Sequence, residues 1–103
     1  MTPRVSSSAR RAAILALALP LAEQYGFAHI PRGVIISAAG IPPSRFTQLW
    51  TISKFRSDLI KLAAAEGNLC VLAQGLAARH PAALAAPIEL RRRAAEAMIG
   101  VPT

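Results

Sequence analysis

The sequence predicts an all-α fold, a compact bundle of about five helices, on three observations. The chain has 103 residues, enough for a single domain over 1–103 and too few for a second core. Apolar residues make up 53% of it and are mostly Ala and Leu, a mixture that favours closely packed helices. No segment alternates between apolar and polar residues long enough to predict a strand, and eight prolines separate the helices.

The first helix is expected to begin at Ser6, Ser7 or Ser8 and to run to about Tyr25, with Gly26 as its stop. At about 100° per residue, its apolar side chains cover roughly a third of the circumference. This face consists of Ile14, Leu15, Ala18, Leu21, Ala22 and Tyr25. Pro20 points away from the face, so the sequence predicts a kink there and not a break.

A short second helix is expected from Pro31 or Arg32 to Gly40. Proline suits the first turn of a helix, and glycine suits the left-handed turn that ends one. Ile35, Ala38 and Ala39 are expected on its buried face. The two small alanines would let the following helix cross closely.

A third helix is expected after Pro42 and Pro43, which prevent the second helix from continuing and suit the start of a new one. Phe46, Leu49 and Trp50 have the spacing i, i+3, i+4 and are predicted to be buried. The polar side chains are then expected to face solvent: Ser44, Arg45, Thr47 and Gln48. Ser44 is also a candidate cap of this helix.

Two short helices joined by a glycine turn are typical of a helix-turn-helix, here at about 31–50 within a three-helix unit at 8–56. The second helix of such a motif can enter the major groove of double-stranded DNA. Arg and Gln can bond base edges through two hydrogen bonds, so Arg45 and Gln48 are predicted to read bases. The alternative is a helical protein-interaction module, partner-binding or antitoxin-like, that retains the motif as scaffold.

The chain carries twelve Lys and Arg against five acidic residues, a net charge of +7. Such an excess on a small domain favours a polyanion or an acidic membrane surface as partner. The apolar run at 12–22 is too short to cross a bilayer, and we interpret it as helix and not as a secretory signal. We therefore expect no membrane partner and a cytoplasmic, nucleoid-associated protein.

No arrangement of residues predicts catalysis, a cofactor or a metal. Cys70 is the one cysteine and is expected in the core, and His29 and His80 have no partners at metal-ligand spacing. The acidic residues form neither a carboxylate pair nor part of a nucleophile–base pair. The sequence therefore predicts a protein that is not an enzyme.

The stretch from Ile14 to about Asp58 resembles the DNA-binding half of the tetracycline-repressor (TetR) family. The resemblance is carried by "ILALALPLAEQYGF", "VIISAAGIPPSRFTQLW" and "SKFRSDLI" and by the lengths between them. It implies DNA contacts by Pro42, Pro43, Ser44, Arg45, Thr47 and Gln48. It also implies that Arg32 and Lys54 contact phosphates, together with the N-terminal residues Arg4, Arg10 and Arg11.

Among its departures from the family pattern, the chain has Thr47 where an aromatic residue is usual and a join after Trp50 that is longer by a few residues. Prolines stand at 31 and 42 where the family has Thr and Ser, which removes two helix N-caps worth about 1 kcal/mol each. Only about 45 residues follow Asp58, too few for the usual ligand-binding domain. We therefore expect no small-molecule ligand. By analogy, so short a form suits a regulator on a phage or mobile element.

The C-terminal part, 57–103, is expected to hold two more helices. Ser57 or Asp58 would cap a long helix that ends before Pro81, with a kink or split at Gly67 or Asn68. After a turn at 82–86, a last helix would pack through Ile88, Ala95, Met98 and Ile99. One recognition helix reads only a few base pairs, so the chain is expected to bind DNA as a homodimer. These C-terminal helices are the expected dimer surface. The sequence therefore predicts a transcriptional regulator of the repressor kind that binds an inverted repeat as a homodimer.

Overall fold

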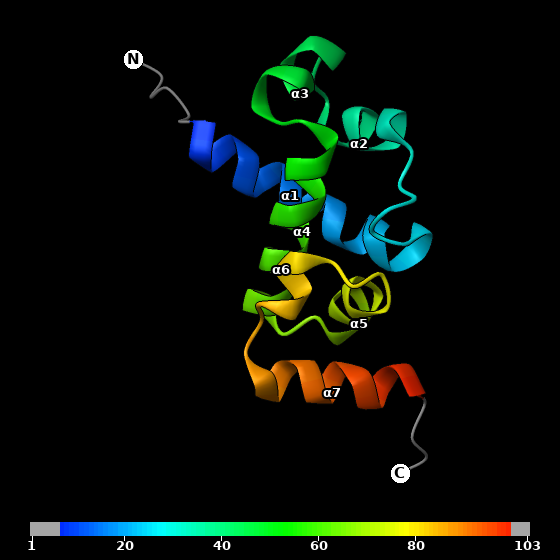
Figure 1. Ribbon diagram of the computed structural model, residues 1–103. Coiled ribbons are helices and arrows are strands. Elements are labelled where there is room, and N and C mark those ends of the chain that lie inside the picture. The colour runs from blue at the N-terminus through cyan, green and yellow to red at the C-terminus, as the bar shows by residue number, and fades with distance from the viewer. Residues whose placement is uncertain (1–6, 100–103) are drawn as a thin grey trace.

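The computed structural model describes residues 7–99, and every regular element among them is a helix (Figure 1). The helices are α1 (Ser7–Tyr25), α2 (Arg32–Ala39), α3 (Pro43–Leu49), α4 (Ile52–Glu66), α5 (Leu69–Ala77), α6 (Pro81–Leu84) and α7 (Ile88–Ile99). The all-α prediction is confirmed. The expected number of about five is wrong, because the described part of the chain contains seven.

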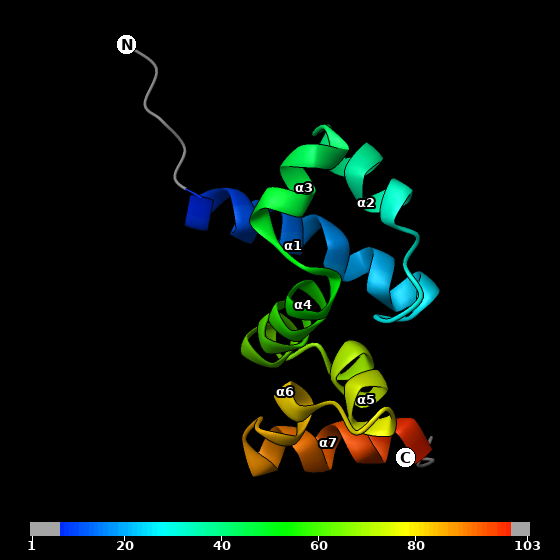
Figure 2. The same ribbon diagram turned by 45° about the horizontal axis from the view of Figure 1, so that its top comes forward.

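The helices form an elongated arrangement in which α4 connects two ends. Figures 1 and 2 show α2 and α3 at one end, beside α1, and α7 lying across the other end beneath α5 and α6. Contacts between α5 and α7, and between α4 and α1, α5 and α6, join the two ends. The helix-turn-helix candidate is therefore far from the C-terminal helix.

The first helix forms largely as its pattern predicts. Ile14, Ala18 and Ala22 are buried, and the helix continues through Pro20, which is exposed. Gly26 follows the helix with φ +91°, a conformation that glycine adopts without strain. Tyr25 is 41% exposed, so its assignment to the buried face is wrong.

The second helix has the predicted ends, and its buried face differs from the prediction at one residue, Ala38, while Ala39 is partly buried as expected. Gly40 is in the left-handed region at φ +66°, and its N–H donates to the carbonyls of Ile36 and Ser37. Ile35 is buried, whereas Ala38 is exposed. The larger Ile36 is partly buried on the opposite side of Ile35 from Ala38, and it turns the helix so that Ala38 faces solvent.

The expected long helix at 59–80 is two helices. Thr51 caps α4, because its hydroxyl accepts the Lys54 N–H at 3.2 Å, so the predicted start at Ser57 or Asp58 is wrong. Gly67, at φ +69°, ends α4. Asn68 then caps α5 by accepting the Val71 N–H at 3.1 Å. A glycine followed by a capping residue separates the helices, as in the split that the sequence allowed.

The C-terminal elements also differ from the prediction. The expected turn at 82–86 contains the short helix α6, whose first turn His80 Nδ1 caps by accepting the Ala82 N–H. On α7, Ala94 is buried and Ile88 is 65% exposed, so the packing face begins later than predicted. Cys70 is exposed and not in the core. The expectations for Arg4 and Ser6, and for the side chains of Met98 and Ile99, lie outside the described residues.

Gly75 marks a close approach of helices in the C-terminal half. A β-carbon added to it would lie 2.6 Å from Cδ1 of Ile60 on α4 and 2.9 Å from Cβ of Ala83 on α6. The absence of a side chain therefore lets α5 contact both helices at once. The buried residues of the described chain form one cluster that extends from α1 to α7.

Candidate nucleic-acid interface

The outer face of α3 is polar, and its inner face is aromatic. Ser44, Arg45, Thr47 and Gln48 are all exposed. Phe46 and Trp50, at the predicted spacing, are 0% and 3% exposed, and Leu49 is partly buried. Because α3 lies at the end of the molecule opposite α7 (Figure 2), its outer face has open solvent beside it.

Three aromatic rings fix α3 on α4. The ring centroids of Phe46 and Phe55 are 5.3 Å apart, and those of Trp50 and Phe55 are 5.2 Å apart at a nearly perpendicular angle of 77°. Aromatic pairs at such distances add about 0.5–1.5 kcal/mol each beyond the buried area. The aromatic cluster therefore sets the position from which α3 presents its polar face.

Arg32 links the two helices of the motif. Its Nη2 donates to the Thr47 hydroxyl at 2.6 Å, and its guanidinium carbon lies 5.2 Å from the ring centroid of Phe46. The Thr47 hydroxyl donates in turn to the Pro43 carbonyl at 3.2 Å. Arg32 on α2 and Thr47 on α3, both predicted DNA contacts, therefore also hold the angle between these helices.

Arg45 and Gln48 differ from this pair, because they are free to meet a ligand. Neither side chain makes a hydrogen bond or ion pair with another residue in the described part of the chain. They are three positions apart, so they lie on neighbouring positions of the same helix face. Ser44 is exposed one residue before Arg45. These side chains are the polar groups that α3 can offer without breaking an existing contact.

Proline at the two helix starts has the predicted consequence. Pro31 and Pro42 occupy the N-cap positions of α2 and α3, and neither helix has a side-chain cap. Pro42 and Pro43 are exposed. The first amides of both helices therefore depend on solvent or a ligand for their acceptors.

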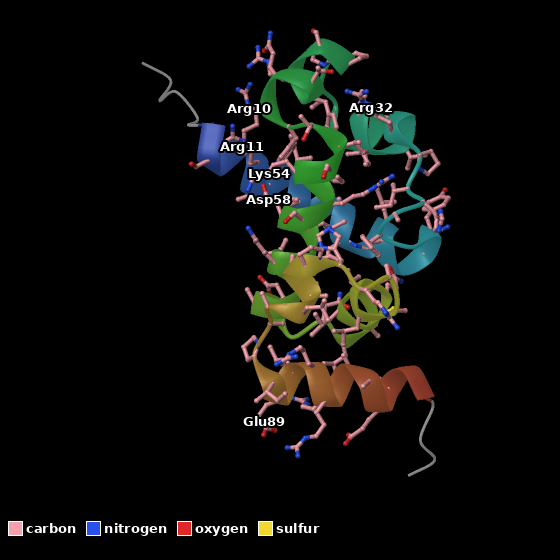
Figure 3. All side chains as sticks on the ribbon, in the orientation of Figure 1. Arg10, Arg11, Arg32, Lys54, Asp58 and Glu89 are labelled. Carbon is pink, nitrogen blue, oxygen red and sulfur yellow. The ribbon has the colours of Figure 1, made fainter. Side chains whose placement is uncertain are left out.

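Arg11 and Lys54 lie on the other side of α3 from Arg32 (Figure 3). Arg11 is half-buried on α1, and its Nε donates to the Leu49 carbonyl at 3.2 Å, which satisfies one of the last carbonyls of α3. Lys54 is exposed on the first turn of α4, with Nζ 3.3 Å from Oδ1 of Asp58. Both line a cavity of about 440 Å³, and Arg10 is half-buried just before Arg11.

Two contacts of this region have no signal in the sequence pattern. Arg56 Nη2 donates to the Ala28 carbonyl at 3.0 Å, which ties α4 to the connection between α1 and α2. Asp58, expected to be a helix cap, accepts the indole N–H of Trp50 through Oδ2 at 3.0 Å. Both depend on how helices meet in space. The spacing along the chain does not indicate them.

A second cavity, of about 490 Å³, lies between α5 and α7, where no small-molecule site was expected. It is lined by Cys70, three alanines and Gln74. The Gln74 amide is already bonded, with Oε1 accepting the Phe27 N–H at 2.8 Å and Nε2 donating to the Ala22 carbonyl at 3.1 Å. Cys70 Sγ also accepts from Gln74 Nε2, at 3.8 Å, so both polar side chains that line the cavity are already engaged.

Two classes of site are absent from residues 7–99. No three His, Cys, Asp or Glu side chains gather where they could hold a metal ion. None of the helices there combines the length and apolarity needed to cross a bilayer.

Comparison with known proteins adds no relative to this picture. No protein-family model, no curated protein and no solved structure matches the chain. The resemblance to the TetR family therefore stays a prediction that rests on the three quoted segments.

Proposed function

We propose that the protein is a sequence-specific, double-stranded DNA-binding transcriptional regulator of the TetR type, acting as a repressor. The observation that carries the proposal is the outer face of α3, where Arg45 and Gln48 are exposed and unpartnered while Phe46 and Trp50 anchor the helix from within. An α-helix fits the major groove, and these two residue types recognise guanine and adenine by paired hydrogen bonds.

The surrounding cations suit the DNA backbone. Arg10, Arg11 and Lys54 lie to one side of α3 and Arg32 to the other (Figure 3). A helix in the major groove has a phosphate strand on each side, so this arrangement matches the charges of the duplex. With these four cations and the predicted contact of Arg4, about five phosphate contacts in all, the slope of log K against log salt is expected to be about −4 to −5.

A homodimer would give the two-fold reading that an inverted repeat requires. Because α3 and α7 lie at opposite ends (Figure 1), contact between the outer faces of two α7 helices would point the two α3 helices apart. The subunits must therefore stand side by side, with the symmetry axis running roughly along α4. In this arrangement the two subunits contact each other through the sides of their C-terminal helices.

The test is fluorescence anisotropy with a labelled random duplex and with duplexes selected from a random pool. Arg45→Ala is expected to weaken the selected site by about 1–3 kcal/mol, the value of one paired base contact, with less effect on random DNA. Arg93→Ala, an exposed arginine on α7, is the control for lost charge. Equal losses on both duplexes would make Arg45 a phosphate contact. No binding to random duplex at low salt would favour the interaction-module alternative.

A further inference from the structure

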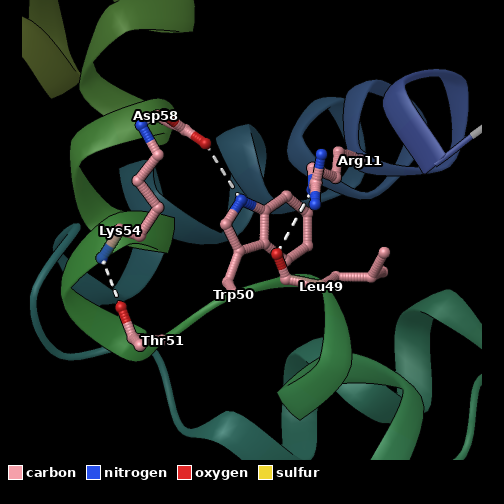
Figure 4. Close-up of polar contacts among 6 residues, drawn as sticks. All are labelled: Arg11, Leu49, Trp50, Thr51, Lys54 and Asp58. Carbon is pink, nitrogen blue, oxygen red and sulfur yellow. Dashed lines mark hydrogen bonds and ion pairs between the residues drawn. The ribbon is translucent and has the colours of Figure 1, made fainter.

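The carboxylate of Asp58 makes two contacts beside the candidate interface, one with each of its oxygens. Its Oδ2 accepts the Trp50 indole N–H at 3.0 Å, and its Oδ1 lies 3.3 Å from Lys54 Nζ (Figure 4). The Asp58 side chain is 20% exposed, against 59% for Lys54. Asp58 is the only acidic residue among those that line the 440 Å³ cavity beside Arg11 and Lys54.

The bond to Trp50 positions α3. Trp50 directly follows α3, is 3% exposed, and packs against Phe46 and Phe55. An indole N–H in such an apolar cluster costs about 1–3 kcal/mol when it has no acceptor. On the neighbouring residue, the Leu49 carbonyl is held by Arg11 from α1 (Figure 4). The C-terminal end of α3 is therefore fastened to α1 by one bond and to α4 by the other.

The ion pair between Asp58 and Lys54 affects how Lys54 can contact the phosphates of DNA. Lys54 stands on the first turn of α4 and shares a cavity with Arg11. While it pairs with Asp58, its charge is partly neutralised and its ammonium is held along α4 by an i, i+4 contact. A DNA phosphate would have to compete with that carboxylate and would also meet the carboxylate's negative charge.

We infer that Asp58 is a positioning residue with two separable effects, an inference that rests on the proposed function. Through Trp50 it fixes α3 for base reading. Through Lys54 it withholds one cation from the phosphates. The first effect supports binding to the specific site. The second weakens binding to specific and random duplex alike, because phosphate contacts carry no sequence information, so the first effect alone raises the ratio between the two affinities.

Asp58→Asn separates the two effects, because an amide oxygen can still accept the indole N–H while the negative charge is lost. One additional phosphate contact makes the slope of log K against log salt steeper by about 0.9. The affinity of Asp58→Asn relative to the wild type should therefore be about eightfold higher at 0.1 M salt than at 1 M. We expect this gain in affinity when Asp58→Asn binds random duplex. Glu66→Gln, at the far end of the same helix, removes the same charge and should change affinity less than twofold.

Two further variants complete the test. Lys54→Ala added to Asp58→Asn should abolish the gain. Asp58→Ala should expose the indole of Trp50, the only tryptophan, and so shift its emission to longer wavelength and raise acrylamide quenching, while Asp58→Asn stays near the wild type. Circular dichroism confirms that each variant is folded.

The outcomes are distinct. If the wild type binds duplex and Asp58→Asn binds no better than Glu66→Gln, the withheld-cation part is overturned and the proposed function stands. If Trp50 emission and quenching are the same in Asp58→Ala and wild type, the positioning part is overturned without any use of DNA. Failure of all forms to bind duplex overturns the proposed function and the DNA part of this inference together.

Discussion

Gly75→Ala is expected to destabilise the protein, although alanine is the better helix former. The gain in helix propensity is about 1 kcal/mol. Against it stand two contacts of the new β-carbon, at 2.6 Å from Ile60 Cδ1 and 2.9 Å from Ala83 Cβ. Ile60 Cδ1 ends a flexible side chain and can rotate away. Ala83 Cβ is fixed to the backbone of α6, so this contact can be relieved only by moving a helix.

Overpacking costs about 1–3 kcal/mol, and the upper part of that range, about 2–3 kcal/mol, applies here because a helix must move. After the gain of about 1 kcal/mol in helix propensity is subtracted, the net loss in the free energy of unfolding is expected to be about 1–2 kcal/mol. At a urea m-value of about 1.5 kcal/mol/M, the midpoint falls by about 1 M. Urea unfolding followed by far-UV circular dichroism measures both quantities. The m-value should stay constant, because the substitution changes native packing and leaves the unfolded chain almost as it was.

Gly33→Ala is the matched control. Gly33 lies in the first turn of α2, is exposed, and has no atom within 4 Å of an added β-carbon. Alanine there should leave the free energy of unfolding unchanged or raise it by up to about 1 kcal/mol, so the urea midpoint should not fall. A Gly75→Ala midpoint equal to or above that of the wild type would refute the close approach of α5 to α4 and α6.

Two further stability predictions concern the junction between the halves. Asn68→Ala removes the N-cap of α5 and should cost about 1 kcal/mol, whereas Asn68→Ser keeps a capping oxygen and should recover most of it; equal midpoints would disprove the cap. Gln74→Leu leaves the Phe27 N–H without an acceptor and removes one of two donors to the Ala22 carbonyl, which keeps the Gly26 N–H, so it should cost about 1–3 kcal/mol. The exposed Gln24→Leu should cost little in the same urea titration. Similar losses for the two glutamine variants would show that Gln74 does not hold α1 to α5.

The first half of the fold could be predicted because its ends are set by strong local signals. Gly26 and Gly40 in the left-handed region, and the prolines before α2 and α3, act through the backbone and need no tertiary partner. The exposed face of α3 followed from the spacing of Phe46 and Trp50. Periodicity works there because one face is aromatic and the other polar.

The second half was less predictable because its signals are ambiguous. Thr51, Ser53 and Ser57 could all cap the helix that follows, and the packing of Trp50 and Phe55 selects the first. In α5 and α7 the many alanines fit either a buried or an exposed position. The periodicity therefore did not indicate that Cys70 and Ile88 would be exposed.

The contacts within the candidate interface were beyond sequence reasoning for a third reason. The Arg32–Thr47 and Trp50–Asp58 bonds join different helices, and each requires the angle between those helices to be known. Residue types alone suggested that Arg32 and Thr47 meet DNA. They gave no indication that the two side chains already meet each other.

The proline starts of α2 and α3 have a consequence for how this end of the molecule behaves. Helices of eight and seven residues without side-chain caps do not persist alone in water, so they depend on the aromatic cluster and on Arg32. Their amide protons should exchange with deuterated solvent before those of α4. Docking onto a duplex would slow that exchange, and the entropy lost in doing so would subtract from the affinity.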